Sequence, residues 1–163
     1  MPKPKPPTAK AVAQMSGPPA PHAITFEVAG RMMPKERARA GGGHHYTPKD
    51  TRRAEEAIRE ITRVAFHGYG PWRGAVRVDL DLILSPPESW SARRRARALE
   101  GEVVPTSKPD VDNWQKALFD GAEGVAYRND SQITEVVIRK RYGPRSKAVV
   151  TMTPLPGEPA YAR

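Results

Sequence analysis

The stretch AVRVDLDLIL, residues 75–84, alternates apolar and charged side chains along most of its length. The apolar positions are Val76, Val78, Leu80, Leu82 and Leu84, and Arg77, Asp79 and Asp81 lie between them. Successive side chains of a strand point to opposite faces of a sheet, so this period of two predicts a strand with one buried face. Asp79 and Asp81 share the other face, where a solvated surface is their expected role.

The same pattern recurs on both sides of this stretch. AITFEVA, residues 23–29, alternates Ile24, Phe26 and Val28 against Thr25 and Glu27, which predicts another strand. The stretch ITEVVIRKRYGPRSKAVVTMTP, residues 133–154, reads as two strands around a Gly-Pro turn. Residues 30–46 are rich in glycine and basic side chains, which favours a loop.

Helical segments separate the strands. From Thr47 and Pro48 to Gly68, apolar residues recur at helical spacing, and residues 91–102 and 110–122 also favour helices. The resulting order is β-α-β-α-β-β, with the basic segment around 91–102 between the second strand and the next helix. The economical fold is α+β, a single mixed sheet with helices packed on it.

The chain has 163 residues, which suits one domain, expected over residues 22–153. Residues 1–21 hold seven of the 18 prolines and are expected to form a disordered, weakly basic tail, and residues 154–163 a flexible C-terminal tail. No secretion signal and no apolar run of about 18 residues is visible, which favours a cytoplasmic protein without a membrane span.

The net charge is strongly positive. The chain carries 27 Lys and Arg residues against 18 Asp and Glu residues, a formal charge of +9. Such an excess favours polyanions through counterion release and long-range attraction, so nucleic acid is the leading partner. Because the chain contains no cysteine, disulfides, thiolate nucleophiles and Cys-ligated zinc are excluded.

Against this background, KPDVDNWQKALFD, residues 108–120, gathers several carboxylates. Over residues 110–125, helical spacing predicts that the side chains facing the core are Val111, Trp114, Leu118, Ala122 and Val125. Asp110 and Asp112 would stand about 200° apart on a continuous helix, so they converge only if Asp110 sits at or before the helix cap. Pro109 supports that placement.

A third acid follows in YRNDSQI, where Asp130 precedes a strand. If Asp130 approaches Asp110 and Asp112, the three carboxylates form a hard-oxygen site suited to Mg²⁺ or Mn²⁺. A purely structural explanation is also open: Asp110 as N-cap, Asp112 as a first-turn acid with Lys116 as its i+4 partner, and Asp130 as a turn residue.

The segment KPDVDNWQKALFDGAEGVAYRNDSQI, residues 108–133, resembles the core motif of the RusA-type Holliday junction resolvases, metal-dependent endodeoxyribonucleases of bacteria and their prophages. GRMMPKERARA and YTPKDT upstream resemble the basic loop and first helix start of the family, so the resemblance covers roughly residues 23–152. Asn129 departs from the second acid found there in relatives, and the proline-rich N-terminal extension is another departure.

The resemblance implies roles for particular residues. It makes Asp110, Asp112 and Asp130 the metal-binding catalytic acids, with Lys116 as a catalytic or DNA-contacting cation and Asp120 and Asn113 in support. The implied reaction is Mg²⁺-dependent hydrolysis of a phosphodiester with 5′-phosphate products, with Mn²⁺ able to substitute, by a homodimer acting on four-way DNA junctions. The expected phosphate contacts are Arg31, Lys35, Arg37, Arg39, Arg93, Arg94, Arg95, Arg97 and Lys108.

Two other functions stay open at this point. A nuclease of the same fold could prefer flaps, forks or other branched DNA, and a non-catalytic DNA-binding protein could use the acids as caps and ion-pair partners. Trp90, beside the arginine cluster, is the tryptophan best placed to stack on an exposed base.

Overall fold

The computed structural model describes residues 22–30, 39–41, 44–46 and 49–157. One sheet contains β1 (Ile24–Ala29), β4 (Val76–Leu84), β5 (Ile133–Tyr142) and β6 (Lys147–Pro154), in the order β1-β6-β4-β5. β4 and β5 run parallel, and the other neighbours run antiparallel. The predicted α+β fold with helices packed on a mixed sheet is therefore confirmed, and a second sheet of two short strands was not predicted.

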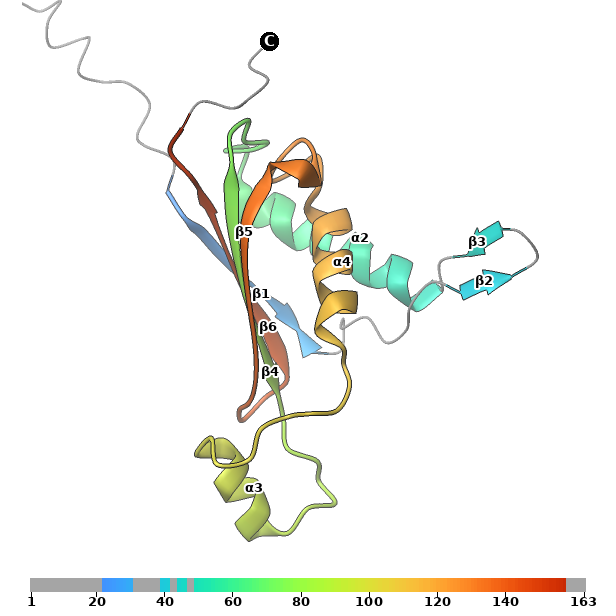
Figure 1. The fold of residues 1–163 in the computed structure, drawn as a ribbon, viewed down its shortest axis with the longest axis vertical. Coiled ribbons are helices and arrows are strands. Elements are labelled where there is room, and N and C mark those ends of the chain that lie inside the picture. Colours follow the sequence, from blue (N-terminus) through green and yellow to red (C-terminus); the bar gives the residue numbers. More distant parts are fainter. Residues whose placement is uncertain (1–21, 31–38, 42–43, 47–48, 158–163) are drawn as a thin grey trace, which may run out of the picture.

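The helices of the described residues are α2 (Lys49–Phe66), α3 (Ala92–Leu99) and α4 (Val111–Ala122), and α4 is followed by the 3₁₀ turn η2 (Asp130–Gln132). α2 and α4 lie side by side over one face of the sheet, whereas α3 stands beyond the end of the sheet (Figure 1). All three helices coincide with predicted ones to within a few residues. In the described part of the chain, no helix has the length and apolar character needed to cross a membrane.

The core lies between the sheet and this pair of helices. Val76, Val78, Leu80 and Leu82 of β4 are buried, as their alternation predicted. α4 packs against the sheet through Trp114, Leu118 and Ala122, which are fully buried. The prediction for Val111 is wrong: its side chain is 40% exposed, because it is the first residue of α4 and precedes the turn that packs on the sheet.

α2 and α4 approach each other closely at Gly121. A Cβ atom at this position would lie 2.8 Å from Cγ2 of Ile58 and 2.9 Å from the backbone oxygen of Glu55. Nearby, the Arg59 guanidinium of α2 donates to the backbone oxygens of Asp120 at 3.0 Å and Glu123 at 2.9 Å. The last carbonyl groups of α4 are thus satisfied by a basic side chain, which fixes this end of the helix against α2.

The order of the last two strands differs from the simplest interpretation of the sequence. β5 and β6 follow each other around Gly143 but do not pair, because β4 lies between them. The sequence of each strand explains this arrangement. β6 buries Ala148, Val150 and Met152 and takes an inner position, whereas the charged β5 is an edge strand.

The loop predicted for residues 30–46 is wrong in part. Arg39–Gly41 forms β2 and His44–Tyr46 forms β3, and the two strands pair antiparallel with Arg39 opposite Tyr46. A Gly-Gly pair between two short runs is a recognised hairpin signal, which the loop interpretation of this glycine-rich stretch did not use.

Candidate functional site

The first part of the site is the N-terminus of α4. Asp110 is the N-cap residue, with extended backbone angles of φ −74° and ψ 136°, and its backbone oxygen accepts a bond of 3.4 Å from the Trp114 amide. This confirms the predicted position of Asp110 at the cap. Its side chain, however, makes no capping hydrogen bond. The carboxylate of Asp110 is exposed and, unlike that of an ordinary N-cap aspartate, does not accept a hydrogen bond from an amide of the first helical turn.

The next residues continue the site along α4. Asp112 lies in the first turn and is exposed, and Asn113 beside it is half-buried. Both acids stand at the helix end where the backbone dipole favours negative charge. Lys108, in the segment leading to the helix, is also exposed.

A lysine from the sheet holds this helix start in place. The Lys140 ammonium of β5 donates to the backbone oxygens of Ser107 at 2.7 Å and Pro109 at 3.3 Å. Lys140 is not among the site residues that the sequence predicts. The signal was present, since the period of two puts Lys140 on the same face of β5 as Ile138, which packs against the core.

Lys116 takes a different partner from the one that the structural alternative named. Its ammonium lies 3.7 Å from the Asp120 carboxylate, one turn further along α4, and its side chain is 73% exposed. Glu55 of α2 is close to both: partial burial, and next the Asp120 carboxylate, raise its pKa, while the Lys116 charge opposes the shift. Lys116 is therefore an accessible cation on the surface shared by α2 and α4.

Asp130 lies at the opposite end of α4. It is the first residue of η2, where Asn129 accepts a bond of 3.0 Å from the Ser131 amide and Gln132 accepts two backbone bonds. The Tyr127 hydroxyl donates to the backbone oxygen of Phe119, near the end of α4. Burial, followed by the nearby Glu123, Asp130 and Asp120 carboxylates, raises the pKa of the Tyr127 hydroxyl.

The three predicted acids therefore do not meet within one chain. Asp110 and Asp112 are at the beginning of α4, and its 12 residues span about 18 Å before the turn that carries Asp130 (Figure 1). Among the described residues, no group of three or more His, Asp or Glu side chains is placed to hold a metal ion.

The predicted phosphate contacts fall into two groups. Arg93, Arg94, Arg95 and Arg97 are all exposed on α3. Arg39 belongs to β2, and Arg31, Lys35 and Arg37 lie outside the described residues. Trp90 is half-buried, with the Arg94 guanidinium 3.9 Å from the centre of its ring and the Tyr142 ring 5.5 Å away.

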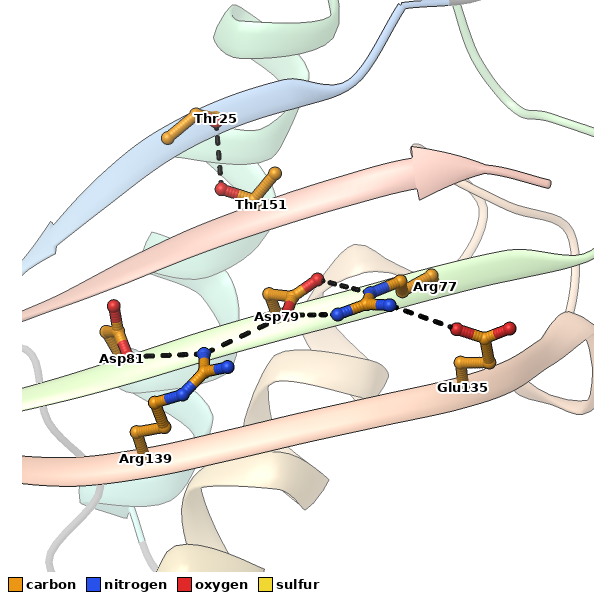
Figure 2. Close-up of polar contacts among 7 residues, drawn as sticks. All are labelled: Thr25, Arg77, Asp79, Asp81, Glu135, Arg139 and Thr151. Atoms are coloured by element: carbon orange, nitrogen blue, oxygen red, sulfur yellow. Dashed lines mark hydrogen bonds and ion pairs between the residues drawn. The ribbon is translucent and has the colours of Figure 1, made fainter.

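Asp79 and Asp81 lie on the face of the sheet opposite α2 and α4, among ion pairs (Figure 2). Arg77 donates to both oxygens of Asp79 at 2.7 and 3.0 Å, and Arg139 lies 3.9 Å from each acid. Hydrogen bonds from Arg77 lower the pKa of the Asp79 carboxyl. The arginines thus balance these two acids, but the predicted solvated face is only partly realised. Both acids are half-buried, and Oδ1 of Asp81 is buried without a hydrogen-bond partner among the described residues.

Comparison with known proteins places these features in a family. An uncharacterized protein of Bacillus subtilis, YqaN, is 32% identical over 79 residues, which is 47% of this chain and 56% of the relative. The aligned region is thus little more than half the length of that protein. Residues 29–153 match the family described as endodeoxyribonuclease RusA, and this match includes the whole of α4 and η2. The chain belongs to the RusA endodeoxyribonuclease family, as the resemblance of its central segment indicated.

Proposed function

We propose that this protein is a Mg²⁺-dependent endodeoxyribonuclease that resolves four-way DNA junctions by paired cuts in the cytoplasm, where the bacterial chromosome lies. The observation that carries the proposal is that the carboxylate of the N-cap residue Asp110 makes no capping hydrogen bond. It lies near Asp112 at a helix start that Lys140 holds in place. The match to the RusA family over residues 29–153 supports a nuclease reaction.

Asp110 and Asp112 suit Mg²⁺, which is commonly held by one or two carboxylates together with substrate phosphate and water. When bound, such an ion lowers the pKa of a water and neutralises charge on the phosphate oxygens. Lys116, exposed one turn after Asp112, supplies a positive charge to the phosphate, and Asn113 supports the acids. Mn²⁺ is expected to replace Mg²⁺, because it accepts the same oxygen ligands.

Asp130 enters this site from a second copy of the chain. Carboxylate oxygens must lie about 2.1 Å from Mg²⁺, and the length of α4 separates Asp130 from Asp110 in the same chain. A dimer with two-fold symmetry can place Asp130 of each copy at the α4 start of the other. The same symmetry matches a four-way junction, which requires two equivalent cuts.

The DNA is held by the basic side chains outside this site. The exposed arginines of α3 and Lys108 are proposed to contact phosphates, together with Arg31, Lys35, Arg37 and Arg39. With a formal charge of +9, the chain is expected to bind DNA with a strong dependence on salt.

Cleavage of a labelled synthetic four-way junction tests the function. The wild type is expected to make paired symmetric nicks with Mg²⁺ and none with EDTA, and Asp112→Asn is expected to bind without cutting. A flap and a replication fork, assayed beside the junction, distinguish a resolvase from a nuclease for other branched DNA. Binding without cleavage in Mg²⁺ and in Mn²⁺ would instead identify a DNA-binding protein.

Mixed dimers test the shared site. One copy carries Asp112→Asn, the other carries Asp130→Asn, and two different affinity tags select the dimer that contains both. This mixed dimer should regain one intact site. It should cut one junction strand and bind half the Mn²⁺ of the wild-type dimer. The matched control joins Asp110→Asn with Asp112→Asn, which leaves no intact site and should stay inactive. An inactive Asp112→Asn and Asp130→Asn dimer, or an active Asp130→Asn protein, would exclude Asp130 as a residue contributed by the second copy.

A further inference from the structure

Helix α3 is attached to the rest of the protein along one narrow face. Ala98 is its buried residue, and Arg94, one turn earlier on the same side, lies over the Trp90 ring at 3.9 Å. Trp90 in turn meets the edge of Tyr142, at the end of β5. The cation–π and aromatic contacts give this face of α3 a fixed place on the end of the sheet.

Both ends of α3 are also tied down. The Ser91 side chain accepts a bond of 3.3 Å from the Arg94 amide and caps the N-terminus. Near the C-terminus, Arg97 forms an ion pair of 2.6 Å with Glu102. An isolated helix of eight residues is marginal in water, so these contacts are what keep this one formed.

The outward side of α3 is formed by small and apolar residues. At 100° per residue, Ala92, Ala96 and Leu99 follow one another on the side away from Arg94 and Ala98. All three are exposed, and Leu99 is 50% exposed. This outer ridge of α3 has no bulky charged side chain that would keep another surface at a distance.

Arginines flank the outer ridge on both sides. Arg93 lies on one side and Arg95, two residues later and so about 200° around the axis, lies on the other. Both side chains are exposed, and no hydrogen bond or ion pair joins either of them to the described part of the chain. Arg94 and Arg97, by contrast, are used to hold the helix in place.

From this arrangement we infer that α3 enters the major groove of a duplex arm of the substrate, with Arg93 and Arg95 reaching phosphates on opposite walls. The inference rests on the proposed function, because it identifies how that function's DNA is held. A major groove about 12 Å wide admits a helix of about 10–12 Å diameter, and an outer ridge without charged side chains, with Ala92 and Ala96 as its small residues, allows that approach. Trp90 is then a positioning residue that orients α3, and its ring is occupied by Arg94 instead of a base.

A bulky residue on the outer ridge tests this placement. Ala96→Phe adds volume at an exposed position, so folding should be unaffected, while junction affinity measured by fluorescence anisotropy should fall at least tenfold. Val64→Phe is the matched control, because Val64 is 53% exposed on α2 and should leave affinity unchanged. Guanine N7, a major-groove atom, should be protected from dimethyl sulfate by the wild type and not by Ala96→Phe.

The salt dependence of binding tests whether Arg93 and Arg95 contact phosphates on the two walls of the groove. Arg93→Ala and Arg95→Ala should each lower the slope of log K against log salt by about one, and the double variant by about two. The groove placement would be overturned if Ala96→Phe bound the junction as tightly as the wild type does. It would also be overturned if only one of the two arginine variants lowered the salt slope. Junction cleavage by the wild-type protein in the same samples shows separately whether the proposed function holds.

Discussion

Replacement of Lys140 by methionine should greatly lower the rate of junction cleavage and only slightly lower the free energy of unfolding. Lys140 donates to the backbone oxygens of Ser107 at 2.7 Å and Pro109 at 3.3 Å, immediately before Asp110. Hydrogen bonds from a charged group contribute about 1.5–3 kcal/mol each, but the bond to Pro109 is long, and water can replace the ammonium at the exposed Ser107. We expect Lys140→Met to lose about 1 kcal/mol of unfolding free energy.

The effect on cleavage follows from the position of Asp110. Once Ser107 and Pro109 are released, the start of α4 can shift, and a displacement of about 1 Å at a reacting group costs about 100-fold in rate. Single-turnover junction cleavage should therefore fall about 100-fold, while urea denaturation shows a folded protein. Lys140 is in this respect a positioning residue for the acid.

A matched lysine provides the control. Lys147 of β6 pairs with Glu27 at 2.6 Å on the uncovered face of the sheet, so Lys147→Met should change stability by less than about 1 kcal/mol and leave cleavage intact. Cleavage by Lys140→Met within about threefold of the wild type would refute the positioning role. Equal losses in both variants would point to net charge instead of position.

Two further predictions concern the sheet and the helix pair. Hydrogen bonds from Arg77 hold the pKa of the folded Asp79 carboxyl below its unfolded value, so their stabilisation is present above about pH 4 and is lost as pH falls through the folded pKa. The stability difference between wild type and Asp79→Asn should shrink accordingly in acid, and a difference that grows would contradict the assignment. Gly121→Ala should cost about 1 kcal/mol in urea denaturation, because overpacking against α2 costs about 1–3 kcal/mol and helix propensity returns about 1 kcal/mol. A more stable variant would show that the two helices can separate at no cost.

Local features of this fold were predictable because they depend on neighbours in the sequence. The alternation of Val76 to Leu82 gave β4, and the position of Asp110 before Val111 gave the cap of α4. Residues two apart on a helix differ by about 200°, so Asp110 and Asp112 can converge only with Asp110 at or before the cap, where the structure has it. The RusA family assignment was likewise carried by a continuous segment of the chain.

The arrangement of distant segments was not predictable in the same way. That β4 separates β5 from β6 depends on a competition among strands for the inner position, which no single strand reveals. The sequence places Asp130 only 18 residues after Asp112, yet α4 carries the chain away from its own beginning before the turn is made. The anchoring bonds of Lys140 are of the same kind, since they join residues 31 and 33 positions apart.

The parallel pairing of β4 with β5 has a consequence for how this fold can be altered. Parallel neighbours need a long connection, and here residues 85–132 make it, carrying both the arginine helix α3 and the acids of α4. The antiparallel pairings of the same sheet, β1 with β6 and β6 with β4, do not depend on the length or sequence of that connection. Residues 85–104 could therefore be exchanged as one unit, to change the DNA contacts proposed for α3, while the sheet and the acids of α4 stay as they are.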